Sequence, residues 1–157
     1  MADQKPPRCT GDELSTVMAL LQFQRESFVR KVAGVDDDAA RRRLVGSDTT
    51  LLWLTRHLAL AERLWVLDRF AGEDVVPGDD AIEADLSIAA AIDSYRTAWV
   101  EVEAVVSAAN LDDLCRRPGD LGDANLRWVL MHLLEETARH AGHADIIREL
   151  IDGSVGR

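Results

Sequence analysis

The chain has 157 residues, a net charge of −10 and 47% hydrophobic residues, which suits one globular domain and excludes an intrinsically disordered protein. No apolar run approaches the ~20 residues of a membrane span, and no basic cluster offers the surface that nucleic acid requires. The N-terminus lacks the apolar core of a signal peptide, and Cys9 and Cys115 lie in unlike contexts that indicate no disulfide. We therefore expect a cytoplasmic protein that binds neither membranes nor nucleic acid.

The chain begins with an expected arm and a long helix. Residues 1–11 are polar and contain a proline pair, which predicts a flexible N-terminal arm before a single domain over 12–153. Thr10-x-x-Glu13 has the form of a capping box, in which two side chains satisfy the first backbone N–H groups of a helix. Apolar residues then recur at helical spacing as far as about Val32.

Four further helices are predicted in chain order, a short one followed by three long ones: 37–43, 48–70, about 83–110 and about 124–152. Pro77-Gly78 breaks the chain between the second and third long helices, and Gly153 is placed to end the last. No strand-like alternation and no internal repeat is present in the sequence. We therefore predict an all-α protein, a four-helix bundle whose helix order stays open.

The histidines of the last long helix share its apolar face. With roughly 100° per residue and His132 at zero, His143 lies at roughly 20°, Glu136 at 40° and His140 at 80°. The same arc holds the apolar residues Val129, Leu133, Ile147 and Leu150. The acids of the opposite face are Glu135, Asp145 and Glu149. Glu136 and His140 are therefore expected to face the core.

A carboxylate buried without a partner costs several kcal/mol, so Glu136 must be paired, protonated or bound to a metal. Glu136 and His140 are four residues apart, which stacks them one turn apart on one helix face. His57, on the apolar side of the second long helix, would complete a set of two histidines and one carboxylate. Such a set leaves coordination positions open, as a catalytic metal needs.

Plainer interpretations stay open for each of these residues. A Glu and a His at this spacing form ordinary helix ion pairs, and a histidine on an apolar face is often a core residue. His143 is either a fourth ligand or a hydrogen-bond partner of a ligand, and His132 is expected to pack in the interior. Trp53 and Trp65 flank His57 along its helix and are either core residues or the lining of a pocket beside the metal.

Two stretches resemble the DinB-like superfamily, in a branch of actinobacterial-type domains. One is the run 126–145, Leu-Arg-Trp-Val-Leu-Met-His through Glu-Glu-Thr-Ala-Arg-His-Ala-Gly-His-Ala-Asp. The other is Trp53-Leu-Thr-Arg-His-Leu and the residues that follow to Trp65. The resemblance implies a DinB/YfiT-like four-helix bundle that holds a divalent metal through His57, Glu136 and His140. Glu136 departs from the commoner histidine and looks like the arrangement in mycothiol-dependent maleylpyruvate isomerase.

The resemblance also implies a thiol S-transferase-like activity with mycothiol or a similar low-molecular-weight thiol. In that hypothesis the thiol is the nucleophile toward a small electrophile, so no side chain of the protein is assigned a catalytic role. Zinc fits the ligands, while nickel, iron and manganese stay open. Two alternatives remain, a metal-dependent hydrolase and a non-catalytic bundle that binds a metal or a partner. The resemblance is compatible with a homodimer paired through one helix face.

Overall fold

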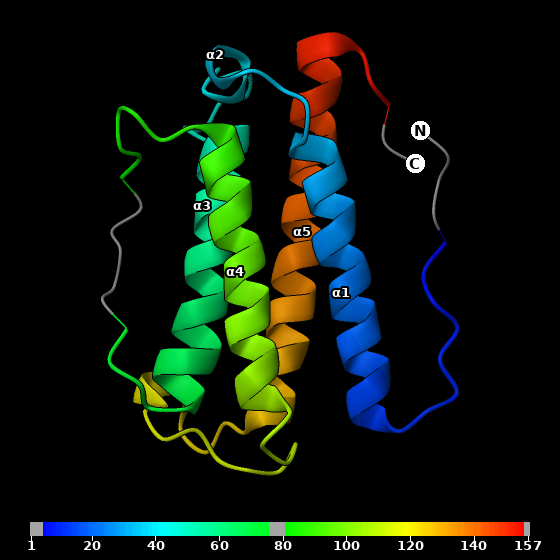
Figure 1. Ribbon diagram of the computed structural model, residues 1–157, viewed down its shortest axis with the longest axis vertical. Coiled ribbons are helices and arrows are strands. Elements are labelled where there is room, and N and C mark those ends of the chain that lie inside the picture. Colours follow the sequence, from blue (N-terminus) through cyan, green and yellow to red (C-terminus); the bar gives the residue numbers. More distant parts are fainter. Residues whose placement is uncertain (1–4, 76–80, 156–157) are drawn as a thin grey trace.

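The computed structural model describes residues 5–75 and 81–155, which contain no regular β-strand. The elements in chain order are α1 (Glu13–Val32), α2 (Asp37–Ala40), α3 (Leu51–Glu62), the π-helix η1 (Arg63–Phe70), α4 (Ile88–Val106), the 3-10 turn η2 (Gly119–Leu121) and α5 (Leu126–Asp152). The four long rods of the bundle are α1, α3 continued by η1, α4 and α5 (Figure 1). The predicted fold class, an all-α four-helix bundle, is confirmed.

The rods run up, down, down and up in chain order, as Figure 1 shows. The connection through α2 stays at the top of the bundle, so α1 and α3 are antiparallel neighbours in the chain. By contrast, α3 and η1 end at the bottom while α4 begins at the top. The chain between Phe70 and Ile88 therefore returns along the bundle, and the predicted break at Pro77-Gly78 in this link lies outside the described residues.

Helix packing divides the core into two regions. α1 packs against α5, α3 and η1 pack against α4, and α3 also contacts α5. The upper region is built around Phe28, Leu51, Tyr95 and Ile147. The lower region is built around Leu21, Val66, Val102 and Leu130. Each region draws buried side chains from all four rods, so the bundle has a continuous interior along its axis.

The start of α1 differs from the prediction. Asp12 is the N-cap, since its carboxylate accepts a hydrogen bond from the Ser15 N–H at 2.8 Å. The expected capping box between Thr10 and Glu13 is therefore wrong, because Glu13 is already the first residue of the helix. Residues 5–11 are exposed and outside any helix, and their flexibility stays a prediction.

The second rod changes type at Arg63. Up to Glu62 it is an α-helix, and from Arg63 to Phe70 it is a π-helix with i→i+5 hydrogen bonding. A π-helix is wider than an α-helix, so each residue advances by a smaller angle around the axis. Side chains beyond Glu62 consequently point in directions that a regular α-helix would not give them.

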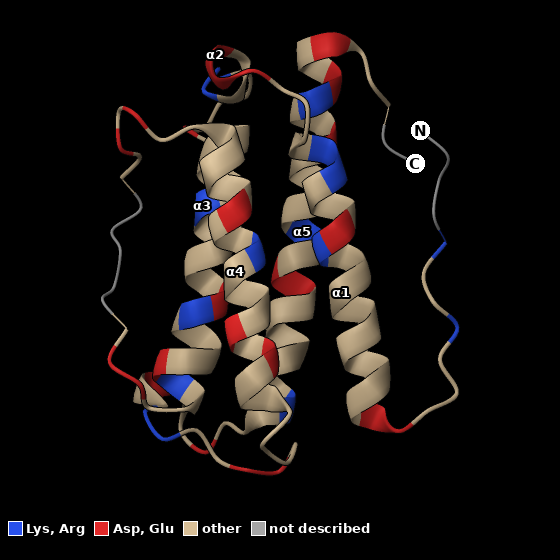
Figure 2. Ribbon diagram, in the orientation of Figure 1, with Lys and Arg blue, Asp and Glu red and all other residues tan. Residues whose placement is uncertain are grey.

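Charged residues of both signs are spread over the rods and the connecting segments in Figure 2. No helix in the described part of the chain is both long enough and apolar enough to cross a membrane.

Candidate metal-binding site

The candidate site lies where α3 contacts α5. His57 projects from α3, and Glu136 and His140 project from consecutive turns of α5. The Nε2 atom of His57 lies 3.0 Å from Oε1 of Glu136, and Nε2 of His140 lies 3.2 Å from the same oxygen. Imidazoles from two helices therefore converge on one carboxylate oxygen.

Trp53 holds the imidazole rings in place. Its indole stacks on the His57 ring with centroids 4.7 Å apart and 14° between the planes, one helical turn earlier on α3. Its edge also meets the His140 ring at 6.4 Å. The two imidazoles themselves meet edge to face at 4.9 Å. Aromatic packing of this kind limits the rotation of both rings about their side-chain bonds.

The protonation states at the site follow from burial and from these contacts. Burial opposes ionisation of Glu136, but the hydrogen bonds and charges of His57 and His140 together outweigh it, and the pKa of this carboxyl is lowered. Burial lowers the pKa of His140 as well, against the attraction of the Glu136 carboxylate. An ionised carboxylate beside a neutral imidazole is the state in which these side chains bind metal ions.

The spacing of the donor atoms fits a divalent ion. One donor atom from each of His57, Glu136 and His140 lies within 4.8 Å of the other two. Two ligands bound tetrahedrally at 2.0–2.2 Å would be roughly 3.4 Å apart, close to the two nitrogen–oxygen distances above. The three side chains are 23%, 18% and 12% exposed, so an exogenous ligand has access from solvent. We refer to these three residues as the donor set.

Comparison with known proteins identifies the family. The family model described as mycothiol S-transferase matches residues 16–153, nearly the whole chain. The chain belongs to the mycothiol S-transferase family. This confirms the resemblance to the DinB-like superfamily that the two helical stretches indicated. No curated protein matches the chain.

A solved structure supports the fold of this mycothiol S-transferase family member. The crystal structure of a conserved protein from Enterococcus faecalis superposes with a TM-score of 0.65, covering 92% of this chain and 100% of that one. The two sequences are 14% identical, so the likeness concerns the fold alone.

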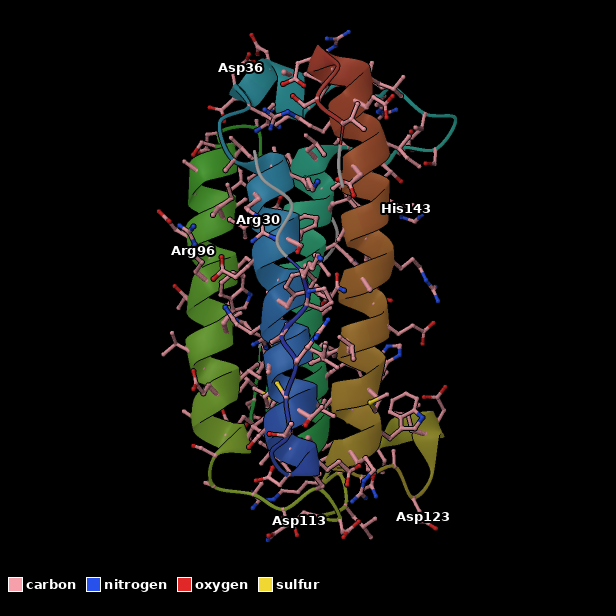
Figure 3. The ribbon with its side chains drawn as sticks, turned by 90° about the vertical axis from the view of Figure 1, so that its right-hand side faces the viewer. Arg30, Asp36, Arg96, Asp113, Asp123 and His143 are labelled. Carbon is pink, nitrogen blue, oxygen red and sulfur yellow. The ribbon has the colours of Figure 1, made fainter. Side chains whose placement is uncertain are left out.

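The remaining predicted residues supply no donor atom to the set. His143 is exposed and projects outward from α5 in Figure 3, with its Nδ1 3.4 Å from Nδ1 of His140 and no donor atom in the set. His132 is half-buried and packs against Trp65 at 4.5 Å between ring centroids. Trp65 thus lies beside His132, whereas Trp53 lies beside the donor set.

The core contains a buried polar cluster that was not expected from the sequence. The guanidinium of Arg25 donates to both carboxylate oxygens of Glu62, at 2.7 and 2.5 Å, and both side chains are almost fully buried. Around this ion pair lie the buried polar side chains of Tyr95, Trp99 and Thr137. The sequence feature that indicated this cluster is Arg25, a charged residue on the apolar stripe of α1, four residues after Leu21.

Proposed function

We propose that the protein is a metal-dependent S-transferase that joins a mycothiol-type thiol to a small electrophile. The observation that carries the proposal is the convergence of His57, Glu136 and His140, from two helices, on a point open to solvent. The family match supports a thiol as the cosubstrate, and the geometry of the donor set supports the metal.

The donor set would form a negatively charged binding site for the ion. His57, Glu136 and His140 would bind the ion, with Trp53 fixing the imidazole orientations. The chemistry that a bound divalent ion would supply here is a lowered pKa for a thiol that reaches it, so that the sulfur would be a nucleophile at neutral pH. In the net reaction the S–H bond breaks and its proton goes to water, while the sulfur forms a C–S bond with the electrophile as a C–X bond breaks and X leaves with the bonding electron pair, as bromide leaves monobromobimane.

The protein's cysteines are not needed for this chemistry. Cys9 is exposed on the N-terminal segment. Cys115 is buried, and burial raises the pKa of its thiol, which disfavours the reactive thiolate. Neither belongs to the donor set. The nucleophilic sulfur is therefore assigned to the cosubstrate.

The first experiment measures metal content in untagged protein purified without chelator. We expect near-stoichiometric metal in the wild type and in His143→Ala, and little metal in His57→Ala and His140→Ala. His143→Ala is the matched control because it removes an imidazole one turn from His140 and outside the donor set. Equal metal in all four proteins, or none in folded wild type, would contradict the proposal.

The second experiment measures conjugation of mycothiol to monobromobimane and to other small electrophiles. Activity should require both the metal and the thiol, and should disappear in His140→Ala while circular dichroism shows an intact bundle. Ester or amide hydrolysis without added thiol would instead identify a hydrolase. Metal binding without either reaction would identify a non-catalytic bundle.

Three further details belong to the proposal. The two nitrogens and one oxygen favour zinc, with metal analysis deciding between zinc, nickel, iron and manganese. A cytoplasmic location follows from the thiol cosubstrate. A homodimer has a surface available in a groove of about 300 Å³ between α1 and α5, lined in part by Leu20, Met131 and Leu134. Light scattering in solution would test the dimer.

A further inference from the structure

A second aromatic cluster lies on the contact between the second rod and α5, away from the donor set. It consists of Trp65 from η1 and of Trp128 and His132 from α5. His132 lies 4.5 Å from Trp65 and stacks on Trp128 at 5.0 Å, with 10° between the planes. The two indoles meet at 5.6 Å. We call these three residues the aromatic platform.

The platform and the donor set lie along one row of side chains that winds slowly around α5. Trp128, His132, Glu136 and His140 follow one another at four-residue intervals. Each interval rotates the side chain by roughly 40° and advances it by about 6 Å along the helix. The platform therefore extends from about 6 to about 12 Å from Glu136 toward the lower end of α5. In Figure 3 this is the direction from His143 toward Asp123.

The π-helix brings the other half of the platform to α5. Trp65 is eight residues after His57, which on a regular α-helix would rotate it by roughly 80° away from His57. The smaller angle per residue in η1 reduces this rotation and turns Trp65 toward His132. π-Helical turns occur often at functional sites because they redirect side chains in this way.

The platform is only partly covered by the protein. Trp128 is 42% exposed, and Trp65 and His132 are half-buried. Within residues 5–75 and 81–155, the ring nitrogens of these three side chains make no hydrogen bond. The platform thus combines apolar ring faces with polar N–H groups that are available to a ligand. Rings that only served as core would be expected to be more deeply buried.

This combination matches the chemistry of a sugar or cyclitol ring. Such a ring has a C–H face that packs on aromatic rings and a rim of hydroxyl groups that accept and donate hydrogen bonds. A thiol attached to such rings could bring its sulfur to the donor set and its rings to the platform, about one to two helical turns away. The spacing therefore favours a glycosidic thiol over a small thiol without rings.

We propose that Trp65, His132 and Trp128 form a subsite for the carbohydrate part of the thiol cosubstrate. The inference rests on the proposed S-transferase function and adds to it the residues that select the thiol. Trp65 and Trp128 supply the packing surface, and His132 holds the Trp128 ring in its stacked orientation.

The test titrates zinc-loaded protein with three probes and follows tryptophan fluorescence and heat of binding. The probes are mycothiol, its glucosaminyl-inositol fragment without the thiol, and N-acetylcysteine, which has the thiol without the rings. Trp128→Ala should weaken binding of mycothiol and of glucosaminyl-inositol by roughly five- to tenfold and leave N-acetylcysteine unchanged. Ile146→Ala is the matched control, because Ile146 is similarly exposed, at 56%, on α5 and belongs neither to the platform nor to the groove between α1 and α5.

The outcomes separate the subsite from the reaction. Glucosaminyl-inositol should also bind His140→Ala without metal, and this result would support the subsite even if no S-transferase activity were found. Mycothiol conjugation with the same KM in wild type and Trp128→Ala would leave the reaction standing and overturn the subsite. Absence of glucosaminyl-inositol binding to the wild type would overturn the subsite as well.

Discussion

At the scale of single residues, Glu136 is the group on which the candidate site depends. It accepts from His57 and His140 through the same oxygen, and these contacts lower its pKa against the effect of burial. Core packing alone does not require a carboxylate at this position, because an apolar residue would fill the same space at a lower cost in free energy.

Glu136→Gln should lower the affinity for zinc by at least about a hundredfold, because loss of a partner outside the ligand shell already costs 10–100-fold and this change removes a charged donor. A chelating dye in competition with the protein would measure the affinity. Glu135→Gln is the control, since Glu135 is the preceding residue, exposed and paired with Arg139. Equal loss of affinity in both variants would indicate a general charge effect.

Tyr95 gives a prediction on pH. Burial is the main cause that raises the pKa of its phenol, with Glu62 adding to the effect, far above the ordinary value of about 10. The unfolded chain releases this proton near pH 10 while the native state retains it, so the native state loses stability as pH rises above about 10. Since the chain has a single tyrosine, absorbance at alkaline pH should report ionisation only on unfolding. Ionisation near pH 10 in the folded protein would contradict the burial of this group.

The residues of the donor set could be derived from the sequence because helical periodicity determines which side chains share a face. His57, Glu136 and His140 do come together in the structure. Leu150, placed on the same arc, is 53% exposed, although Ile147 is buried and Ile151 packs against the core at the same end of α5. Periodicity gives the relative directions of side chains and does not tell which part of the arc the neighbouring helices cover.

At the scale of elements, the Arg25–Glu62 pair joins α1 to the end of α3. It lies where the α-helix becomes a π-helix, and it is enclosed by aromatic residues of α4. Removal of one charge from a buried ion pair destabilises the fold, because the other charge is left buried and unpaired.

Glu62→Gln should destabilise the fold by about 3–5 kcal/mol, measured as the free energy of unfolding in urea. Glu101→Gln is the matched control, because Glu101 pairs with Arg63 at 2.7 Å on the surface between the same rod and α4, with 38% exposure. Its loss should cost no more than about 1 kcal/mol. Similar losses in both variants would show that burial of the Arg25–Glu62 pair has no special cost.

Element boundaries were partly predictable. The long helices were placed within a few residues, because apolar spacing persists along each of them. The predicted start of α4 is too early. The helix begins after Ser87, whose side chain is its N-cap, and the Ile88 N–H donates a hydrogen bond of 2.7 Å to the carboxylate of Asp37 in α2. The change to a π-helix at Arg63 left no signal in the apolar spacing, so the position of Trp65 could not be derived.

At the scale of the whole molecule, the donor set connects the two helix pairs of the bundle, α1 with α5 and α3 with α4. Zinc at a hundred times its dissociation constant should stabilise the native state by about 2.7 kcal/mol. For a chain of this length we expect a rise in Tm of roughly 5–10 °C, measured calorimetrically. His57→Ala should lose this rise. A rise of equal size in His57→Ala would show that the ion binds elsewhere.

The order of the helices could not be obtained from the sequence. A connecting segment that stays at one end of the bundle and one that runs the length of the bundle have similar compositions. α3 and α4 are parallel because the segment between η1 and α4 runs from the lower end of the bundle to the upper end. The pattern of apolar faces is the same for either order, so it determines the class of fold and leaves the topology undetermined.

The up-down-down-up order of the rods has a consequence for folding of the chain during its synthesis on the ribosome. The partner of α1 is α5, which is synthesised after α3 and α4 and which also carries Glu136 and His140. While α5 is still inside the ribosome, a nascent chain therefore exposes the apolar face of α1 and presents only His57 of the donor set. On the proposed function, metal loading at this position would begin only after α5 has left the ribosome, so a product terminated before α5 would not retain metal in the donor set.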